Sequence, residues 1–246
     1  MRVIGVIPSR WGSTRFPGKS LHPLCGKPLV QWVVEATQRA RALDEIIVAT
    51  DAPQIAEALR GVNVRVAMTR ADHPSGTDRV AEAALPQDDD IIINIQGDEP
   101  LIDPELIDAL AQRLKSDARY EMATAATRIT SPRDLEARSV VKVVCDRDGG
   151  ALYFSRLPIP CQRDGEPEVS SYLRHVGIYA YRGAFLKRLV QEPPCALERM
   201  ESLEQLRALW LGARIAVIET AHAGVGVDTP EDVAHVEALL REKGLA

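Results

Sequence analysis

Residues 91–100 read IIINIQGDEP, and this stretch decides the fold. Ile91–Ile95 is apolar at nearly every position and is rich in β-branched residues, which predicts a strand. A continuous apolar strand is buried on both faces, as strands are in a parallel sheet covered by helices. The polar residues that follow, from Gln96 to Pro100, predict a turn at the carboxyl end of that strand.

The same pattern recurs through the first 115 residues. The expected strands are Val3–Ile7, Glu45–Ala49, Val62–Val66 and Ile91–Ile95, and the expected helices are Leu29–Ala40, Pro53–Leu59, Arg79–Ala84 and Pro104–Leu114. Alternating strands and helices predict an α/β fold, a mostly parallel sheet with helices on both faces. In such a sheet, ligands bind outside the carboxyl ends of the strands.

The later part of the chain has more strands and fewer helices. Short apolar runs at Val140–Cys145, Leu152–Phe154 and Val176–Tyr181 predict further strands. These strands fit either a smaller β-rich lobe, at approximately residues 130–190 of a single domain spanning 1–246, or an antiparallel addition to the sheet. The last expected elements are an amphipathic helix at Glu201–Trp210 with Leu203, Leu206 and Trp210 on one face, a strand at Arg214–Ile218, and a helix at Pro230–Arg241 capped by Asp228 or Thr229.

Composition excludes several classes of protein. The net charge of −5 over 246 residues offers no basic field for nucleic acid. The four cysteines are scattered without CxxC spacing, which is typical of reduced structural thiols. No stretch approaches eighteen apolar residues, so we expect a cytoplasmic protein that does not cross a membrane.

The segment PSRWGSTRFPGKS follows the first expected strand and carries the cations Arg10, Arg15 and Lys19. Backbone N–H groups of a Gly-rich turn can cradle phosphates, and cations neutralise them. The segment is not the P-loop of kinases, because Ser13 stands where that motif requires glycine. A phosphate-binding loop of another kind is the favoured interpretation, and a solvated surface loop is the alternative.

Two carboxylates also lie in Gly-rich turns. Asp98 follows the strand at Ile91–Ile95 and could hold a divalent cation on a triphosphate. Asp228 lies in GVGVDTPED, where simple capping of the last helix is the competing interpretation. The blocks HPSGTDR and HVGIY also follow or form strands, although an Asp at a helix start is usually a cap and a lone histidine is usually a core residue.

Taken together, these blocks resemble the 3-deoxy-manno-octulosonate cytidylyltransferase family, the CMP-KDO synthetases. The matching blocks are IPSRWGSTRFPGKSL, ATD, HPSGTDRVAE, NIQGDEPLI, VVKVV, ALYFSR, RHVGIYAYR, LERMESLEQLRAL and GVDTPED. The resemblance implies a Rossmann-like nucleotidyltransferase sheet and a homodimer formed through the smaller lobe. It also implies transfer of CMP from CTP to KDO with release of pyrophosphate, a step toward lipopolysaccharide.

The resemblance also implies roles for individual residues. Those matched to CTP are Arg10, Arg15, Lys19, Ser75, Gly76 and Asp78. Those matched to the acidic sugar are Gln96, Arg156, His175, Tyr179, Glu204 and Gln205. Asp98 and Asp228 are matched to Mg²⁺ and, with Arg10 and Lys19, form the expected catalytic group.

Among the sugar-side residues, Arg156 is the candidate partner of the sugar carboxylate, because a guanidinium can meet a carboxylate with two hydrogen bonds. Two alternatives stay open: a cytidylyltransferase for another acidic sugar, such as 8-amino-KDO or a sialic acid, and a nucleotide-binding protein without turnover. An NAD-dependent oxidoreductase is excluded, because no G-x-G-x-x-G follows the first strand.

Overall fold

The computed structural model describes residues 1–12 and 16–246. Its main sheet has a central path in the order β11-β7-β10-β6-β1-β4-β5, with β8 and β9 attached beside β10. The strands are β1 (Val3–Pro8), β4 (Glu45–Thr50), β5 (Arg65–Met68), β6 (Ile91–Asn94), β7 (Met122–Arg128), β8 (Lys142–Cys145), β9 (Ala151–Ser155), β10 (Leu173–Arg182) and β11 (Ile215–Glu219).

The central sheet is mostly parallel, as the sequence predicts. Strand β1 pairs in parallel with β4 and β6, β4 with β5, and β7 with β11. Strand β10 runs antiparallel between β6 and β7, and it is the one reversed strand on this path through the described residues. The carboxyl ends of β1, β4, β5 and β6 therefore meet at one edge of the sheet.

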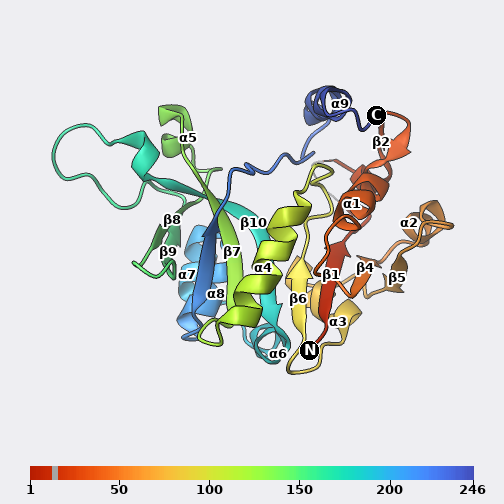
Figure 1. The fold of residues 1–246 in the computed structure, drawn as a ribbon, viewed down its shortest axis with the longest axis horizontal. Coiled ribbons are helices and arrows are strands. Elements are labelled where there is room, and N and C mark those ends of the chain that lie inside the picture. The colour runs from red at the N-terminus through yellow and green to blue at the C-terminus, as the bar shows by residue number, and fades with distance from the viewer. Residues whose placement is uncertain (13–15) are drawn as a thin grey trace.

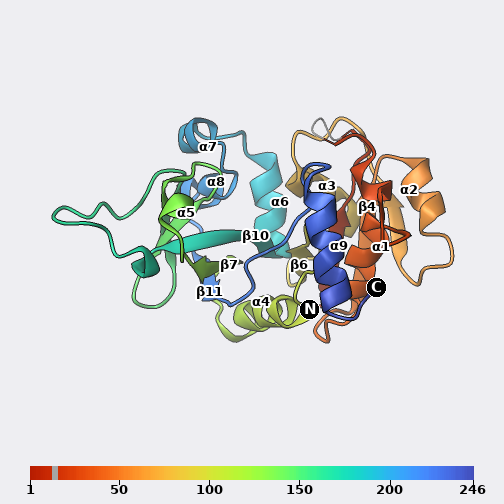
Figure 2. The same ribbon diagram turned by 90° about the horizontal axis from the view of Figure 1, so that it is seen from above.

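Helices cover both faces of this sheet (Figure 1; Figure 2). They are α1 (Leu29–Thr37), α2 (Pro53–Ala58), α3 (Gly76–Ala84), α4 (Pro104–Ser116), α5 (Pro132–Glu136), α6 (Gly183–Gln191), α7 (Ala196–Glu201), α8 (Gln205–Trp210) and α9 (Asp232–Glu242). Helices α1 and α4 pack on one face of the sheet, and α3 and α6 pack on the other.

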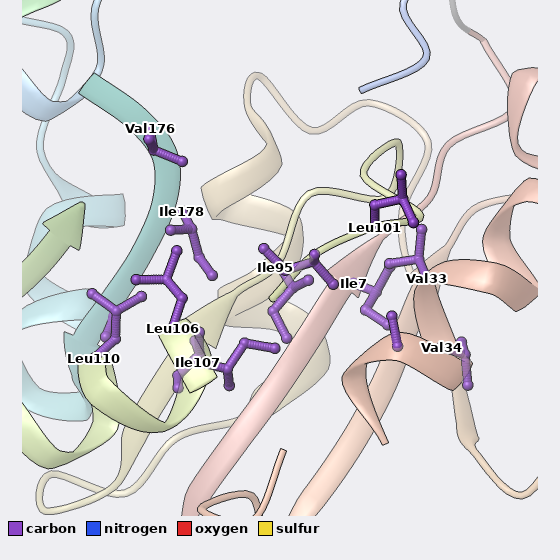
Figure 3. Packing of buried hydrophobic residues seen from close by; sticks show 14 of the residues in the cluster. Ile7, Val33, Val34, Ile95, Leu101, Leu106, Ile107, Leu110, Val176 and Ile178 are labelled. Atoms are coloured by element: carbon purple, nitrogen blue, oxygen red, sulfur yellow. The ribbon is translucent and has the colours of Figure 1, made fainter. Parts of the chain in front are cut away.

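Strand β6 shows how the pattern of apolar residues produces these two layers. Ile91, Ile93 and Ile95 join the core formed with α1 and α4, part of which appears in Figure 3. Ile92 points to the opposite core with α3 and α6. All four are fully buried, and each contributes roughly 1.5–3 kcal/mol of apolar burial. The strand is thereby fixed at the centre of the sheet, and its polar carboxyl end is held in place.

The β-rich part of the chain is joined to the main sheet. Strands β8 and β9 form an antiparallel hairpin that pairs with the beginning of β10, whereas the end of β10 pairs with β6. The segment between β9 and the short 3-10 helix Val169–Ser171 projects away from the body of the molecule (Figure 1). A separate lobe with a dimerisation role at approximately 130–190 stays a prediction.

Two sequence predictions about helices are wrong. The expected helix Glu201–Trp210 is broken, because Ser202 adopts a left-handed conformation with φ 51° that ends α7 before α8 begins. Leu203 and Leu206 are buried, but Trp210 is 62% exposed and so does not share their apolar contacts.

The start of the last helix also differs from expectation. Neither Asp228 nor Thr229 caps this helix, because α9 begins at Asp232. The Asp232 carboxylate instead accepts hydrogen bonds from the backbone N–H groups of Asp228 and Thr229. The Asp228 side chain is thus not used as a helix cap.

Some elements were not anticipated at all. Strand β7 lies in the middle of the sheet, yet its sequence MATAATR is rich in alanine, which carries little strand signal. Pro23–Leu24 and Lys27–Pro28 form the small antiparallel pair β2 and β3 inside the expected long loop. No helix among the described residues is both long enough and apolar enough to cross a membrane.

Candidate functional site

A cavity of about 370 Å³ lies at the carboxyl ends of β1 and β6, where the topology predicts a ligand. We call it the cationic cavity, because Arg10, Lys19 and Arg79 contribute to its wall. The remaining lining residues are Pro8, Ser9, Ser20, Ala71, His73, Pro74, Ser75, Gly76, Gln96, Gly97, Asp98 and Asp228. Segments far apart in sequence thus form a single polar pocket.

Lys19 lies between the two carboxylates of this cavity. It begins a single 3-10 turn, Lys19–Leu21, whereas α1 starts only at Leu29, so the helix of a P-loop is not present at the lysine. The Lys19 Nζ lies 2.6 Å from Asp98 Oδ2 and 3.5 Å from Asp228 Oδ1. The Lys19 side chain is 14% exposed, and its position shows that both carboxylates can contact one cation at the same time.

The donor set suits a magnesium ion. Mg²⁺ prefers oxygen ligands and is commonly held by one or two carboxylates together with phosphate oxygens and water. Asp98 and Asp228 supply two such carboxylates on one wall of a cavity that also carries cations for phosphates. Across residues 1–12 and 16–246, no group of three His, Cys, Asp or Glu side chains could hold a metal by itself, so phosphates and water would complete the set.

Gly97 is required by close packing between two loops. A Cβ atom at this position would lie 2.4 Å from the backbone oxygen of Pro8, far inside van der Waals contact. The close approach that Gly97 permits is thus to the chain itself. Gly97 thereby brings the segment after β6, which carries Asp98, against the segment after β1.

The N-terminus of α3 forms another wall. Ser75 caps this helix by accepting from Asp78 N at 3.2 Å, and its hydroxyl donates to Asp78 Oδ2 at 2.6 Å. Ser75 and Gly76 line the cationic cavity, but Asp78 does not. Asp78 therefore acts as a capping residue behind the wall, and its contact with the nucleotide stays a prediction.

Arg79 is a buried cation in this wall. Its guanidinium donates to Thr69 Oγ1 and lies 3.5 Å from Asp51 Oδ2. The Asp51 carboxylate also accepts from Trp11 N, at 3.1 Å. Arg79 therefore connects the ends of β4 and β5 to the segment that carries Arg10.

A second cavity of about 280 Å³ adjoins the first, and the two share Pro8, Gly76 and Gln96. We call it the tyrosine cavity. Its other lining residues are Thr77, Asn94, Met122, Tyr179, Tyr181, Leu189, Ser202, Leu203, Glu204 and Gln205. Four of the residues expected at a sugar site, Gln96, Tyr179, Glu204 and Gln205, are brought together here.

The tyrosine cavity carries polar groups that are buried in the fold. The Tyr179 hydroxyl donates to Gln205 Oε1 at 3.3 Å. Burial raises the pKa of Tyr179 and also the pKa of Glu204. Both groups are therefore suited to forming directed hydrogen bonds with a ligand.

His175 does not line either cavity. It packs beside Tyr179, with ring centroids 5.4 Å apart, and its Nε2 lies 2.9 Å from Thr124 Oγ1. Burial lowers the pKa of His175 to about 3, so it is neutral at physiological pH. His175 thus packs against the Tyr179 ring and helps to hold that ring in position.

Arg156 is also outside both cavities. Its guanidinium donates to the backbone oxygens of Glu201 at 2.6 Å, Arg138 at 2.9 Å and Ser202 at 3.2 Å. It therefore holds the Ser202 turn, which does line the tyrosine cavity, and a contact of Arg156 with a sugar carboxylate stays a prediction. Arg15, the remaining predicted residue, lies outside the described residues.

Several polar atoms at the two cavities point to a ligand. Gln205 was expected from the sequence, whereas Ser9, His73 and Asn94 were missed. Ser9 Oγ, His73 Nδ1, Asn94 Oδ1 and Gln205 Nε2 are buried without a hydrogen-bond partner among the described residues, and all four residues line one of the two cavities. Buried polar atoms are normally paired, because each unpaired one costs about 1–3 kcal/mol. The only available signal was Asn94, a polar residue inside an otherwise apolar strand.

Glu99 was also missed. Its Oε2 lacks a partner among the described residues, and Gly224 of the segment leading to Asp228 lies beside its other oxygen. Burial, followed by the neighbouring Asp98 carboxylate, raises the pKa of Glu99 to about 7. It lines neither cavity, so it lies behind the two carboxylates and offers no surface for contact.

Comparisons with known proteins all find cytidylyltransferases. Residues 4–215 match the family model described as cytidylyltransferase. The chain is 50% identical to the 3-deoxy-manno-octulosonate cytidylyltransferase of Bdellovibrio bacteriovorus, with all of both chains covered. It is 49% identical to the protein of the same name from Geobacter sulfurreducens, over 98% of this chain and 100% of that one.

Solved structures agree. A CMP:2-keto-3-deoxy-manno-octonic acid synthetase complexed with CTP superposes with a TM-score of 0.92 at 42% identity, over 99% of this chain and 100% of that one. A 4-diphosphocytidyl-2C-methyl-D-erythritol synthase from Anaerococcus prevotii shares the fold, with a TM-score of 0.68 at 15% identity over 98% of both chains.

Proposed function

Because the chain belongs to the cytidylyltransferase family, we propose that it transfers CMP from CTP to the anomeric hydroxyl of KDO and releases pyrophosphate. The observation that carries the proposal is the pair of adjoining cavities that share Gly76 and Gln96. One cavity offers cations and carboxylates for a nucleoside triphosphate, and the other offers neutral polar groups for a sugar. The shared wall is where the two substrates would meet.

The chain's own residues supply positioning and charge. The anomeric oxygen attacks the α-phosphorus of CTP, and the bond from that phosphorus to the bridging oxygen of the β-phosphate breaks. Lys19 and Arg10 neutralise the charge that develops on the leaving pyrophosphate. Binding both substrates against one wall supplies the alignment that such a reaction needs.

Asp98 and Asp228 would hold magnesium. When bound, the ion supplies positive charge to the phosphate oxygens and lowers the pKa of the attacking hydroxyl. Lys19 would then have to leave its position between the carboxylates and turn to the phosphates. The short Lys19–Asp98 contact keeps the two carboxylates paired until that exchange.

The decisive experiment is pyrophosphate release with CTP, magnesium and KDO. ATP, GTP and UTP replace CTP in parallel reactions, and 8-amino-KDO and sialic acid replace KDO. Release with CTP and KDO alone is the expected result. Pyrophosphate release with another acidic sugar would assign that sugar, instead of KDO, as the substrate. Binding of CTP without pyrophosphate release from any pair of nucleotide and sugar would contradict catalysis.

We further propose that the protein is a homodimer. Leu152, Leu157, Met200 and Trp210 are large apolar side chains that are each more than half exposed, and all four lie in or next to β9, α7 and α8 (Figure 1). A self-complementary contact through this region would bury them. Sedimentation should give a dimer, and Trp210→Glu should shift it toward monomer; a monomeric wild type would contradict this assignment.

The biological setting follows from the substrates. CTP is supplied in the cytoplasm, and an activated KDO is a donor for lipopolysaccharide, so we place the reaction there. Recovery of the activity in the soluble fraction of lysed cells, away from periplasmic markers, is the expected outcome.

A further inference from the structure

Glu82 lies on α3, outside both site cavities, yet it anchors a wall of the cationic cavity. Its two carboxylate oxygens accept from Arg70 N at 3.3 and 3.4 Å. The Glu82 Oε2 also contacts His73 Nε2, and the His73 side chain is only 6% exposed. One carboxylate therefore holds both ends of the segment from Arg70 to His73.

The conformation of the segment at residues 70–74 depends mainly on contacts with Glu82. Residues 70–74 belong to no helix or strand, although Ala71, His73 and Pro74 line the cationic cavity. The flanking residues are fixed separately, by Thr69 N donating to Thr50 O and by Ser75 capping α3. Within the described part of the chain, every hydrogen bond of residues 70–74 ends on Glu82, apart from an ion pair between Arg70 and Asp72.

The contact also determines the tautomer of His73. An ionised carboxylate accepts hydrogen bonds and donates none, so the imidazole proton lies on Nε2. When the ring is neutral, Nδ1 is then its acceptor. This atom is buried without a partner among the described residues, and His73 lines the cationic cavity. A donor on a bound ligand would satisfy it.

We propose that Glu82 is a positioning residue for the nucleotide, which fixes the 70–74 segment and holds His73 so that Nδ1 accepts a hydrogen bond from the nucleoside. The inference rests on the proposed function of the cationic cavity as the CTP site. The donor is an N–H or O–H of the base or ribose, because phosphate oxygens at neutral pH are acceptors and could not pair with an acceptor nitrogen. Glu82 itself touches no substrate.

The test uses the two amides that mimic the two ring nitrogens of histidine. In His73→Gln the amide reaches the place of Nε2 and keeps the contact with Glu82, but nothing occupies the place of Nδ1. In His73→Asn the amide occupies the place of Nδ1. We expect His73→Gln to weaken CTP binding about 5-fold, measured by calorimetry, and His73→Asn, which also loses the contact with Glu82, to weaken it at least as much.

Glu82 is tested alongside. We expect Glu82→Ala to raise the KM for CTP about 10-fold with a smaller change in kcat, and Glu82→Gln, which keeps one acceptor oxygen, to recover part of that loss. The control is Glu57→Ala on α2, whose side chain is 60% exposed and pairs only with Arg60 among the described residues. That variant should bind CTP like the wild type.

The outcomes separate this inference from the proposed function. Unchanged CTP affinity in His73→Gln, or a lower kcat at unchanged KM in Glu82→Ala, would overturn the inference while an active wild type left the function intact. A wild type that bound CTP but released no pyrophosphate with any sugar would contradict the function instead. In that case the binding measurements on the variants would still decide the role of Glu82.

Discussion

Lys19 and Asp98 are 79 residues apart in sequence, and their charged atoms lie 2.6 Å apart in the fold. The loop after β1 and the loop after β6 meet because β1 and β6 are adjacent parallel strands. The pair joins the cations of one loop to the carboxylate of the other. Several predictions about individual side chains depend on this arrangement.

Asp98→Asn should lower kcat by about 100-fold or more, because it removes one negative ligand from the carboxylate pair while keeping the shape of the side chain. The measurement is pyrophosphate release at saturating CTP and KDO across a range of magnesium concentrations. Glu105→Gln on α4, an exposed carboxylate away from the cavities, is the control. Near-normal turnover in Asp98→Asn would contradict the metal assignment.

Tyr179→Phe should raise the KM for the sugar about 5-fold and leave the KM for CTP unchanged. The substitution removes the hydroxyl that donates to Gln205 Oε1 in the tyrosine cavity, at a cost of about 1 kcal/mol. Tyr153→Phe on β9 is the matched control, because Tyr153 lines neither cavity. A change in the KM for CTP alone would show that the tyrosine cavity is not the sugar site.

Arg156→Ala should lower the free energy of unfolding by about 2 kcal/mol, since three backbone oxygens lose a charged donor. Chemical denaturation measures this loss, and steady-state kinetics measure the KM for the sugar. Loosening of the Ser202 turn should raise that KM as well. An increase in the KM for the sugar without loss of stability would instead support a direct contact between Arg156 and the sugar carboxylate.

His175 should make the protein less stable in acid. The unfolded imidazole takes up a proton near pH 6.5, whereas burial keeps the folded pKa at about 3. Between these values the unfolded state binds more protons, so stability falls as pH is lowered below about 6.5, by about 2 kcal/mol between pH 7 and pH 5. Urea unfolding at several pH values measures this slope.

The comparison for His175 is between two substitutions. His175→Gln keeps a polar group near Thr124 and should remove that part of the pH dependence. His235→Gln, on the exposed side of α9, should leave it unchanged. Equal slopes in wild type and His175→Gln would mean that the histidine is charged in the folded protein.

Gly97→Ala should destabilise the protein by about 2 kcal/mol and lower turnover, because the added Cβ would meet the Pro8 backbone oxygen at 2.4 Å and force two site loops apart. Thermal unfolding and pyrophosphate release are the two readouts. Gly177→Ala on β10 is the control, since a Cβ there meets nothing within 4 Å. Similar losses in both variants would show that packing at Gly97 has no special role.

The sequence by itself determined the α/β class and the order of the first strands and helices. Continuous apolar runs such as Ile91–Ile95 can be buried only between two layers, and this is a local property of the chain. The same alternation located the ligand site at the carboxyl ends, and the ordered blocks identified the family. The positions of Lys19, Asp98 and Gln96 around the cavities agree with that prediction.

Only the tertiary structure decided which polar side chains face a ligand and which support the chain. Asp78 and Arg156 have the right chemistry for substrate contacts, yet Asp78 pairs with Ser75 and Arg156 donates to backbone oxygens. Conversely, Asn94 is of interest because its Oδ1 has no partner among the described residues, and Glu82 because it accepts from Arg70 N. Neither fact can be inferred from the spacing of residues in the sequence. Hydrogen bonds between residues distant in sequence depend on how the strands are ordered, and strand β7 and the reversed strand β10 show that this order was not readable from local patterns.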